Sequence, residues 1–512
     1  MKKGKLTYYK VVLLACIVLA IRAHAASNNT DSIRTLIVFF DGLRPDYITP
    51  EGMPNLYAFS KTASVGKSHH SVFPSVTRVN ASSYATGAYP GTHGLLGNSV
   101  YFPEVDSVKA INTGDASELL KINKKLNGHL LTAVSLGEVL KKYNKEMMVF
   151  SSGSTGQALM QNHTVSGAII NPAMILPESF QKTVLNEIGA IPPAAKPNHA
   201  RHQWITDALL KFGLRLDGPD VSAIWYSDPD GAAHSDGIGS ASAVASIKSV
   251  DEQFGRILSA LKSKGLSDKF NIVISTDHGF VTYIGTENLV DFLIRSGLKK
   301  NKDSDDIIVA GGALYVKNHD VSLIQKTVSL LQTENWVGAI FTNGLKKNDL
   351  KGFIPGTLSF ESIHWNHAER AADILVDANW TDDKNAAGFS GSSYSKGVAG
   401  HGSLSPYEIT IPLILSGPSF KPSLISELPT SNVDLIPTVL HTLKLPIPNT
   451  VDGRVMYEFL SNNQKKFTPG VKNEIIETAV EINKRNYNLI LNRSKVGKYT
   501  YVNFAKVTRK TN

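Results

Sequence analysis

The 512-residue chain contains almost no cysteine. Its single cysteine, Cys16, lies in an N-terminal apolar segment, so the rest of the sequence can form neither a disulfide framework nor a thiolate-ligated metal site. A protein without disulfides must be stabilised by its hydrophobic core, and this chain is long enough for two or three structural units. We therefore expect a large protein that is held together by its core.

The sequence also lacks an apolar run that would cross a bilayer comfortably. The apolar stretch at residues 11–21 is shorter than the roughly 20 residues that a spanning helix needs. It follows a basic stretch and precedes an Ala-x-Ala sequence ending at Ala25, which is the order of a secretory signal peptide. We expect a signal peptide over residues 1–25, cleavage near Ala25, and an exported protein, periplasmic or secreted, without stable membrane insertion. Lipid attachment at Cys16 is disfavoured because the apolar run continues past it.

A large excess of one charge is also missing from the body of the chain. The formal net charge is +9, but five basic residues within residues 1–25 account for more than half of it. A nucleic-acid polymer is therefore not an expected partner. The basic segment from Lys495 onward is expected to be a solvated surface segment, and the sequence gives no signal for an oligomeric state.

Three continuous apolar runs are present, and each ends in acidic residues. They are TLIVFF (35–40) before Asp41, VSAIWYS (221–227) before DPDGAAH, and FNIVIST (270–276) before DHGF. Such runs are typical of buried parallel strands. Residues 242–265 have the apolar spacing of a helix that ends at Gly265, which completes a strand–helix–strand unit. The sequence therefore predicts an α/β protein with a parallel sheet.

The carboxyl ends of these runs carry candidate metal ligands. Asp230 and His234 are four residues apart, a spacing that puts both side chains on one face of a helix or tight loop. Helix capping would also explain Asp230, and Asp228 competes with it but lacks this spacing to His234. The other candidates are Asp41, Asp277, His278 and His401. Oxygen and imidazole ligands without sulfur suit Zn²⁺, with Mn²⁺ or Fe as substitutes.

The segment VFPSVTRVN (72–80) offers two hydroxyl groups that could attack a substrate, those of Ser75 and Thr77. A short helix is expected to begin at Thr77. Backbone N–H groups and the helix dipole would favour an anionic phosphate there. Two metal ions about 4 Å apart could bind the attacking and leaving oxygens of a phosphoryl transfer.

Other polar residues have plainer interpretations. We expect His69 and His70 to have packing or surface roles and Arg44 and Asp46 to form a local pair, and nothing marks His364 or His367 as ligands.

The pattern changes after the third apolar run. Residues 285–398 contain segments that we interpret as strand, helix, strand and strand, beginning with IIVAGGALYVKN. We expect them to form an inserted α+β cap. The catalytic unit would then comprise residues 32–284 and 399–512.

Six motifs, in this order, resemble those of the bacterial type I phosphodiesterase/nucleotide pyrophosphatase family, within the alkaline phosphatase superfamily. They are DGLRPDY, PSVTRVNASSYATGAYPGTHGLLGN, DPDGAAH, TDHG, GHG and NVDLIPTVLHTL followed by DGR. The resemblance covers about residues 35–285 and 398–456. It implies an alkaline phosphatase-like α/β fold, with a mostly parallel sheet sandwiched by helices and an inserted α+β cap.

The resemblance also implies roles for individual residues. Thr77 would be the nucleophile and Ser75 part of the turn that presents it. Asn98 and the Thr77 backbone amide would bind phosphate oxygens. The implied reaction is a double displacement through a phosphothreonine at Thr77. The implied cofactors are two Zn²⁺ ions, one held by Asp41, Thr77, Asp277 and His278, and the other by Asp230, His234 and His401.

Arg78 departs from the family pattern, because nucleotide-hydrolysing members usually have an aromatic residue after the nucleophile. A guanidinium suits an anionic oxygen of the substrate, although Arg78 could instead pair with a nearby acid. We expect a phosphodiesterase or nucleotide pyrophosphatase acting on a small anionic phosphoester. The alternatives are a phosphomonoesterase, a phosphonate or sulfate ester hydrolase, and a non-catalytic metal-stabilised binding protein.

Overall fold

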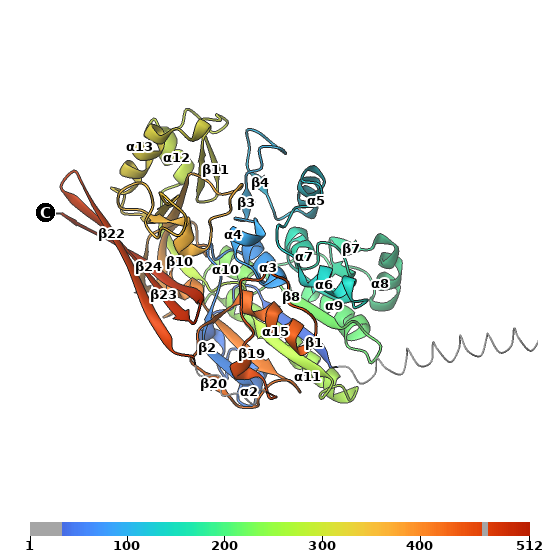
Figure 1. The fold of residues 1–512 in the computed structure, drawn as a ribbon. Helices are drawn as coiled ribbons and strands as arrows, with labels where there is room; N and C mark the ends of the chain where they lie inside the picture. Colours follow the sequence, from blue (N-terminus) through green and yellow to red (C-terminus); the bar gives the residue numbers. More distant parts are fainter. Residues whose placement is uncertain (1–32, 463–468, 512) are drawn as a thin grey trace, which may run out of the picture.

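The computed structural model describes residues 33–462 and 469–511. The predicted signal peptide at residues 1–25 and Cys16 lie outside the described residues. Within the described ranges, none of the helices combines the length and apolar character needed to cross a membrane. One large sheet with helices around it forms the body of the molecule, and smaller sheets lie beside it (Figure 1).

The large sheet has ten strands and carries the predicted apolar runs at its centre. In spatial order its strands are β20 (Ile425–Ser426), β2 (Ser64–His70), β19 (Thr410–Ser416), β9 (Phe270–Ser275), β1 (Arg34–Phe40), β8 (Val221–Tyr226), β5 (Met147–Ser151), β6 (Gly167–Asn171) and β7 (Met174–Leu176), and β21 (Thr430–Ser431) also pairs with β2. Strands β9, β1, β8, β5 and β6 are parallel. Strands β19 and β7 run antiparallel to their neighbours. The predicted, mostly parallel sheet is confirmed.

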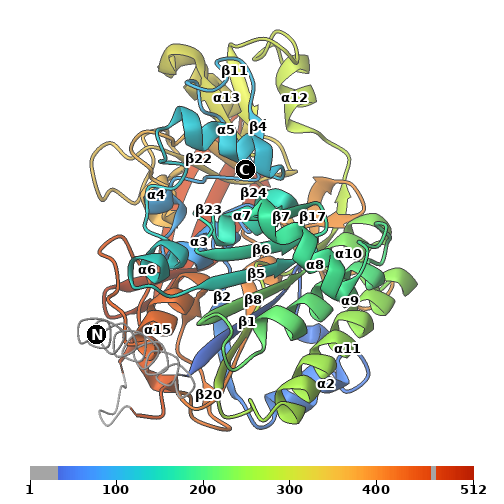
Figure 2. The same cartoon turned by 90° about the vertical axis from the view of Figure 1, so that its right-hand side faces the viewer.

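Helices cover both faces of this sheet (Figure 2). One face is covered by α2 (Pro54–Ser60), α8 (Gln181–Ile188), α9 (His199–Ala208) and α11 (Ala241–Ser263), and the other by α3 (Thr77–Thr86), α5 (Ala116–Lys125), α6 (Leu136–Lys142), α7 (Thr155–Gln161) and α15 (Leu435–Thr442). Alternate residues of β1 face the two hydrophobic clusters: Phe39 packs with the second set of helices and Phe40 with the first. Because both faces are buried, residues 36–40 of the strand are all apolar, which is the pattern that the sequence displays.

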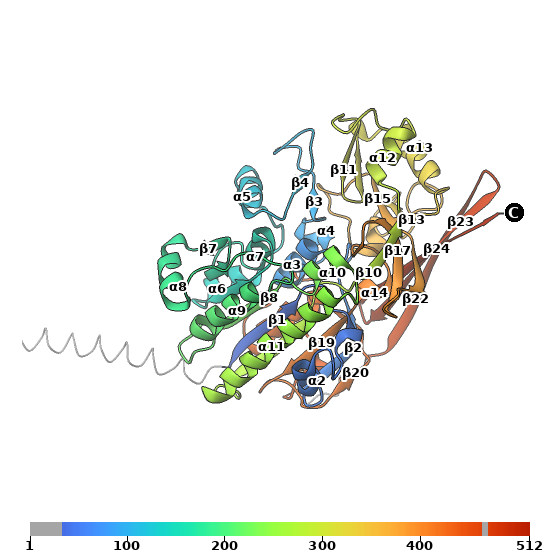
Figure 3. The same cartoon turned by 180° about the vertical axis from the view of Figure 1, so that it is seen from behind.

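The region after β9 forms smaller sheets (Figure 3). One sheet contains β11 (Ile307–Ala310), β12 (Ala313–Val316), β13 (Val337–Thr342), β14 (Leu358–Ser359) and β15 (Ile374–Ala378), with helices α12 (Leu289–Arg295) and α13 (Val321–Leu331). Another contains β10 (Val281–Gly285), β16 (Trp380–Lys384), β17 (Ser390–Lys396) and β18 (Ala399–Gly400). The segment IIVAGGALYVKN forms a hairpin of two strands, not the single strand expected, because Gly311 turns the chain with φ +63°.

The C-terminal segment forms a three-stranded antiparallel sheet of β22 (Val471–Ile482), β23 (Arg485–Val496) and β24 (Tyr499–Thr511). The expectation of a solvated segment from Lys495 onward is wrong. Val502, Ala505 and Val507 are buried, because they face the same hydrophobic cluster as β13. Lys506 and Lys510 lie on the other side of the strand, whereas Arg509 is in register with Val507 and donates to the carbonyls of Gln332 and Val337.

Three short helices and a small hairpin lie among the loops at the carboxyl edge of the large sheet. They are α4 (Pro90–His93), α10 (Asp230–Asp236) and α14 (Pro406–Ile409), and the hairpin of β3 (Ser99–Val100) with β4 (Ile111–Asn112).

Candidate active site

The candidate ligands come from four places that the fold brings to one edge of the large sheet. Asp41 directly follows β1, and Asp277 and His278 follow β9, its neighbour in the sheet. Helix α10 begins at Asp230, after β8 on the other side of β1. His401 directly follows β18. The positions after β1, β8 and β9 are the carboxyl ends of parallel strands, where ligands of open α/β sheets bind, whereas His401 comes from the antiparallel β18 of a smaller sheet.

Asp41, Asp277 and His278 form the first group of candidate ligands. One ligand atom from each lies within 4.8 Å of the others, and all three residues are buried. The Nε2 atom of His278 is 3.0 Å from an Asp277 carboxylate oxygen and 3.6 Å from an Asp41 oxygen. The Thr77 hydroxyl lies 3.4 Å from the same nitrogen.

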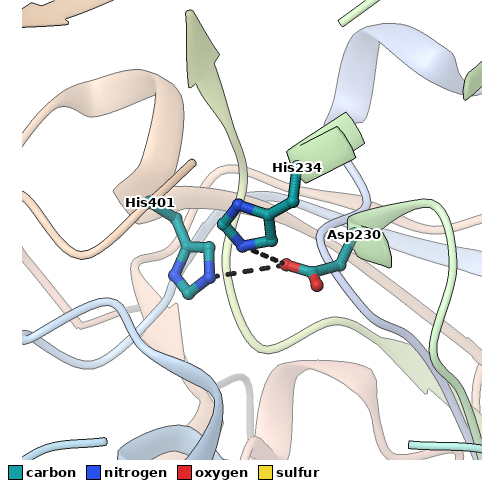
Figure 4. Close-up of side chains that lie close together, drawn as sticks. All are labelled: Asp230, His234 and His401. Atoms are coloured by element: carbon teal, nitrogen blue, oxygen red, sulfur yellow. Dashed lines mark ion pairs between the residues drawn. The ribbon is translucent and has the colours of Figure 1, made fainter. Parts of the chain in front are cut away.

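Asp230, His234 and His401 form the second group (Figure 4). The Nε2 atoms of His234 and His401 are 3.3 and 3.4 Å from the same Asp230 oxygen. The two groups adjoin, because the rings of His278 and His401 are stacked with centroids 3.3 Å apart. The structure therefore brings the six predicted carboxylate and imidazole ligands together.

The three histidines are held in the orientation that a metal ligand needs. Each places its Nδ1 beside a backbone carbonyl: His278 at Gly279 (2.9 Å), His234 at Ala399 (2.9 Å) and His401 at Ser75 (2.8 Å). Donation from Nδ1 fixes the tautomer and leaves the Nε2 lone pair facing the carboxylates.

The carboxylates carry unsatisfied oxygens that face the same space. Trp225 Nε1–H donates to one oxygen of Asp41, and the Gly42 backbone N–H donates to one oxygen of Asp277. One oxygen of each carboxylate, Oδ1 of Asp41 and Oδ2 of Asp230 and Asp277, is buried without a hydrogen-bond partner. Unpaired buried carboxylate oxygens are costly, and a divalent cation would satisfy them. The donor set therefore fits two metal ions with oxygen and imidazole ligands.

The electrostatics of the two groups agree with this fit. Burial, followed by the charges of Asp277 and Asp230, raises the pKa of Asp41 well above its usual range. Burial and then the neighbouring His278 lower the pKa of His401 to about 4, so this ring is neutral at pH 7. Several carboxylates crowded together with a neutral imidazole favour bound cations.

The two candidate hydroxyls have different surroundings. Thr77 is the first residue of α3, where free backbone N–H groups can bind an anion. The Ser75 hydroxyl is fully buried, donates to the carbonyl of Ser403 (2.8 Å) and accepts from the Gly402 N–H (3.2 Å). The hydroxyl beside the first ligand group is therefore that of Thr77.

Asn98 and Arg78 lie next to Thr77. The Arg78 backbone N–H donates to the Asn98 side-chain carbonyl at 3.0 Å, which leaves the Asn98 amide hydrogens available to a ligand. The Nε atom of Arg78 is buried without a hydrogen-bond partner. No carboxylate in the described part of the chain forms an ion pair with Arg78. Burial lowers the pKa of Arg78, and the charges of Asp41, Asp230 and Asp277 oppose that shift.

Arg78, Asn98 and His401 line one side of a cavity of about 480 Å³. The opposite side is formed by residues between β9 and β18, including Gly311 and Leu375. The cavity therefore lies between the large sheet's loops and the smaller sheets, and its lining combines apolar side chains with the Arg78 guanidinium and the carboxylates of Asp377 and Glu408.

The polar residues that were not expected to bind metal make other contacts. Asp228 accepts the backbone N–H groups of Asn198 and Ala232, so it is Asp228 that satisfies the start of α10 and Asp230 that remains free. Arg44 and Asp46 form the expected pair at 2.7 Å. The four histidines that were not expected to be ligands form hydrogen bonds away from the two ligand groups: His69 and His70 with Thr430, His364 with Thr500 and His367 with Thr132.

Two buried carboxylates that were not predicted from the sequence lie beside the site. Glu408 and Asp377 both accept hydrogen bonds from the loop that follows His401. A charged residue in the otherwise uncharged stretch SPYEITIPLIL was the available signal for Glu408.

The sequence profile of the type I phosphodiesterase/nucleotide pyrophosphatase family matches residues 35–381. The chain is 27% identical over 278 residues to the bis(5'-adenosyl)-triphosphatase of Xenopus laevis, covering 52% of this chain and 51% of that protein. It is 24% identical over 251 residues to ectonucleotide pyrophosphatase/phosphodiesterase family member 1 of Rattus norvegicus, covering 49% and 24%. The match thus spans about half of the first relative and about a quarter of the second. With the bis(5'-adenosyl)-triphosphatase of Mus musculus the identity is 24% over 436 residues, covering 83% and 80%.

Solved structures resemble the fold. Murine ectonucleotide pyrophosphatase/phosphodiesterase 5 has a TM-score of 0.59 at 16% identity, covering 84% of this chain and 100% of that chain; an inactive variant of it was solved in complex with AMP. The alkaline phosphatase PafA has a TM-score of 0.64 at 16% identity, covering 83% and 98%. The predicted alkaline phosphatase-like fold is confirmed.

Proposed function

Because the chain belongs to the type I phosphodiesterase/nucleotide pyrophosphatase family, we propose that it is a two-metal hydrolase that cleaves phosphodiester or pyrophosphate bonds through a phosphothreonine at Thr77. The observation that carries this proposal is the Thr77 hydroxyl at the start of α3, 3.4 Å from His278 Nε2 and next to carboxylate oxygens without partners. A non-catalytic binding protein would not need a hydroxyl in that position.

Two Zn²⁺ ions are the proposed cofactors, with Mn²⁺ or Fe as substitutes. Bound at these sites, such ions supply Lewis-acid chemistry that favours the anionic nucleophile and leaving group. The proposed holders of one ion are Asp41, Thr77, Asp277 and His278, and those of the other are Asp230, His234 and His401.

The chain's own groups would carry the reaction in two displacements. Thr77 Oγ1 attacks phosphorus, the bond from phosphorus to the leaving oxygen breaks, and a phosphothreonine forms. Water then attacks phosphorus, the bond to Thr77 Oγ1 breaks, and the hydroxyl is regenerated. The Asn98 amide and the Thr77 backbone N–H donate to the phosphoryl oxygens, which carry the developing charge.

The proposed substrate is a small anionic phosphoester, and relatives named for bis-adenosyl triphosphate and bound to AMP support a nucleotide. The side chain of Arg78 indicates one further property of the substrate. Its guanidinium borders the cavity without an acidic partner, so it suits a second anionic oxygen, as in a pyrophosphate or a phosphomonoester. A monoester, phosphonate or sulfate ester hydrolase is therefore the second candidate function.

A substrate panel tests the proposed function. We expect the zinc-loaded protein to show its highest kcat/KM on bis-aryl phosphate or a dinucleoside polyphosphate, with lower values on aryl phosphate, aryl phosphonate and aryl sulfate. A clear preference for the monoester would favour the second candidate. No turnover of any of these esters would contradict both.

Arg78→Met is expected to separate these substrate classes. Loss of a charge-assisted contact removes about 1.5–3 kcal/mol, or roughly 10- to 150-fold in kcat/KM, for substrates with a second charged oxygen. For a substrate whose leaving group carries no charge, kcat/KM should fall less than threefold, because that group offers no partner to the guanidinium. Arg78→Lys is the matched control, and equal losses on all substrates in Arg78→Met would show that Arg78 has only a structural role.

We also propose that the protein is exported and that it comprises a catalytic unit (32–284 and 399–512) with an inserted cap (285–398). The relatives named as ectoenzymes support export. The cavity wall contributed by β11, β12 and β15 supports a substrate-facing role for the cap.

A further inference from the structure

The carboxylate of Glu408 connects two loops of the candidate active site. We propose that Glu408 is a positioning residue that fixes the nucleophile turn and the His401 loop relative to each other. The expected effect on kcat rests on the proposed function, whereas the positions of the two loops are given by the hydrogen bonds described below.

The first connection is to the loop that follows His401. The Ser403 backbone N–H donates to one Glu408 carboxylate oxygen at 2.6 Å, and the Ser403 hydroxyl donates to the other at 2.5 Å. Glu408 is fully buried, so water cannot replace either contact. Two bonds to one residue in the interior restrict both the position and the rotation of this loop.

The second connection is to the turn that presents Thr77. The Ser75 hydroxyl, which donates to the Ser403 carbonyl at 2.8 Å, also lies 3.2 Å from the Glu408 oxygen that accepts from the Ser403 N–H, so its one hydrogen is shared between two acceptors. The Ser75 carbonyl in turn faces His401 Nδ1 at 2.8 Å, so the turn fixes the ring of a candidate metal ligand. Glu408, Ser75 and His401 therefore form one continuous chain of hydrogen bonds.

The main chain at Glu408 reaches a third part of the site. Its carbonyl accepts the Gly279 backbone N–H at 2.8 Å, and the Gly279 carbonyl faces His278 Nδ1. A side-chain substitution leaves this contact in place. Glu408 variants should therefore disturb the His401 loop and the Thr77 turn while the His278 loop stays anchored.

Asp377 contacts the His401 loop from a different direction. Its carboxylate accepts the Leu404 N–H at 3.1 Å, but it makes no contact with Ser75 among the hydrogen bonds of the described residues. Asp377 contacts only the loop, whereas the Glu408 carboxylate contacts both the loop and the nucleophile turn and so reinforces the direct bonds of Ser75 with Gly402 and Ser403.

A double-mutant cycle between Glu408→Ala and Ser75→Ala tests the proposal. Misplacing a reacting group by about 1 Å can cost 10²-fold, so we expect Glu408→Ala to lower kcat about 100-fold with little change in KM. Ser75→Ala should lower kcat about tenfold. Ser75→Ala also removes the direct bonds of its hydroxyl to Ser403 and Gly402, so the double variant should fall short of the product of the two single effects by about threefold or more. Multiplied effects, or an unchanged kcat in Glu408→Ala, would overturn the proposal.

Two further variants separate positioning from folding. Glu408→Gln keeps an oxygen that can accept from Ser403 and Ser75, so it should restore kcat to within about tenfold of the wild type. Asp251→Asn alters another buried carboxylate, whose bonds go to Asn55 and Leu56. It should lower the melting temperature without coupling to Ser75→Ala. If Glu408→Ala does not fold, Ser403→Ala replaces it in the cycle, with the same requirement of coupling.

A metal readout keeps this proposal distinct from the proposed function. Zinc content is measured after dialysis against increasing chelator, without any substrate. Glu408→Ala should lose one of two ions at a chelator concentration at least tenfold below that for the wild type, because the loop that carries His401 has lost its bonds to the carboxylate. If the wild type hydrolyses no phosphoester, the proposed function fails while this difference still supports the positioning role. Identical zinc retention in both proteins overturns it.

Discussion

Thr77→Ala is expected to lower kcat by roughly four to six orders of magnitude on every phosphoester that the wild type cleaves, the scale seen when a nucleophile is deleted. The methyl group that remains has no lone pair with which to attack phosphorus. The carboxylates and histidines do not depend on the Thr77 hydroxyl for their orientation, since backbone carbonyls and Trp225 supply it. The variant should therefore keep its metal ions and its fold.

Initial rates, metal content and intact-mass spectra of acid-quenched protein are the measurements for this variant. The wild type should show one added phosphoryl group during turnover, and Thr77→Ala should show none. Thr77→Ser is the matched control, because it keeps a hydroxyl and should retain a measurable fraction of the activity. A Thr77→Ala protein that keeps wild-type kcat would contradict the nucleophile assignment.

The centre of the fold could be predicted because its residues follow local rules. Strand β1 is buried on both faces by helices, and this requirement alone makes residues 36–40 apolar. The ligands then follow from topology, since parallel neighbours end at the same edge and bring Asp41 beside Asp277. Short-range sequence pattern and sheet direction are sufficient for both inferences.

The parts that could not be predicted depend on contacts between distant segments. Strand β24 is rich in basic residues, and only its packing against β13 buries the residues between them. Glu408 is recognisable as part of the site only when Ser75, 333 residues away, is placed beside it. Arg78 shows the same limit, because the absence of an acidic partner among the described residues is a property of the folded cavity.

Removal of metal is expected to abolish activity and to lower the melting temperature by several degrees. A ligand that binds only the folded state stabilises it by about 4 kcal/mol at a concentration 1,000 times its Kd. In the metal-free protein, Asp41, Asp230 and Asp277 keep buried oxygens without partners. Chelator treatment followed by scanning calorimetry and re-addition of zinc measures both effects. Full activity after complete removal of bound metal would contradict a metal-dependent mechanism.

Asp41→Asn should have opposite effects on stability in the metal-free and the metal-loaded protein. Burial and the nearby Asp277 and Asp230 disfavour a charge at Asp41, so the neutral amide should raise the melting temperature of the metal-free protein. An asparagine oxygen can still accept from Trp225 Nε1–H. With zinc present the order should reverse, because the variant has lost one anionic ligand of the first group and binds the ion less tightly. Trp225→Phe is the control for a purely local disturbance, and it should lower both melting temperatures. If Asp41→Asn also lowered the melting temperatures of both the metal-free and the metal-loaded protein, Asp41 would be a packing residue and the first group would not be a metal site.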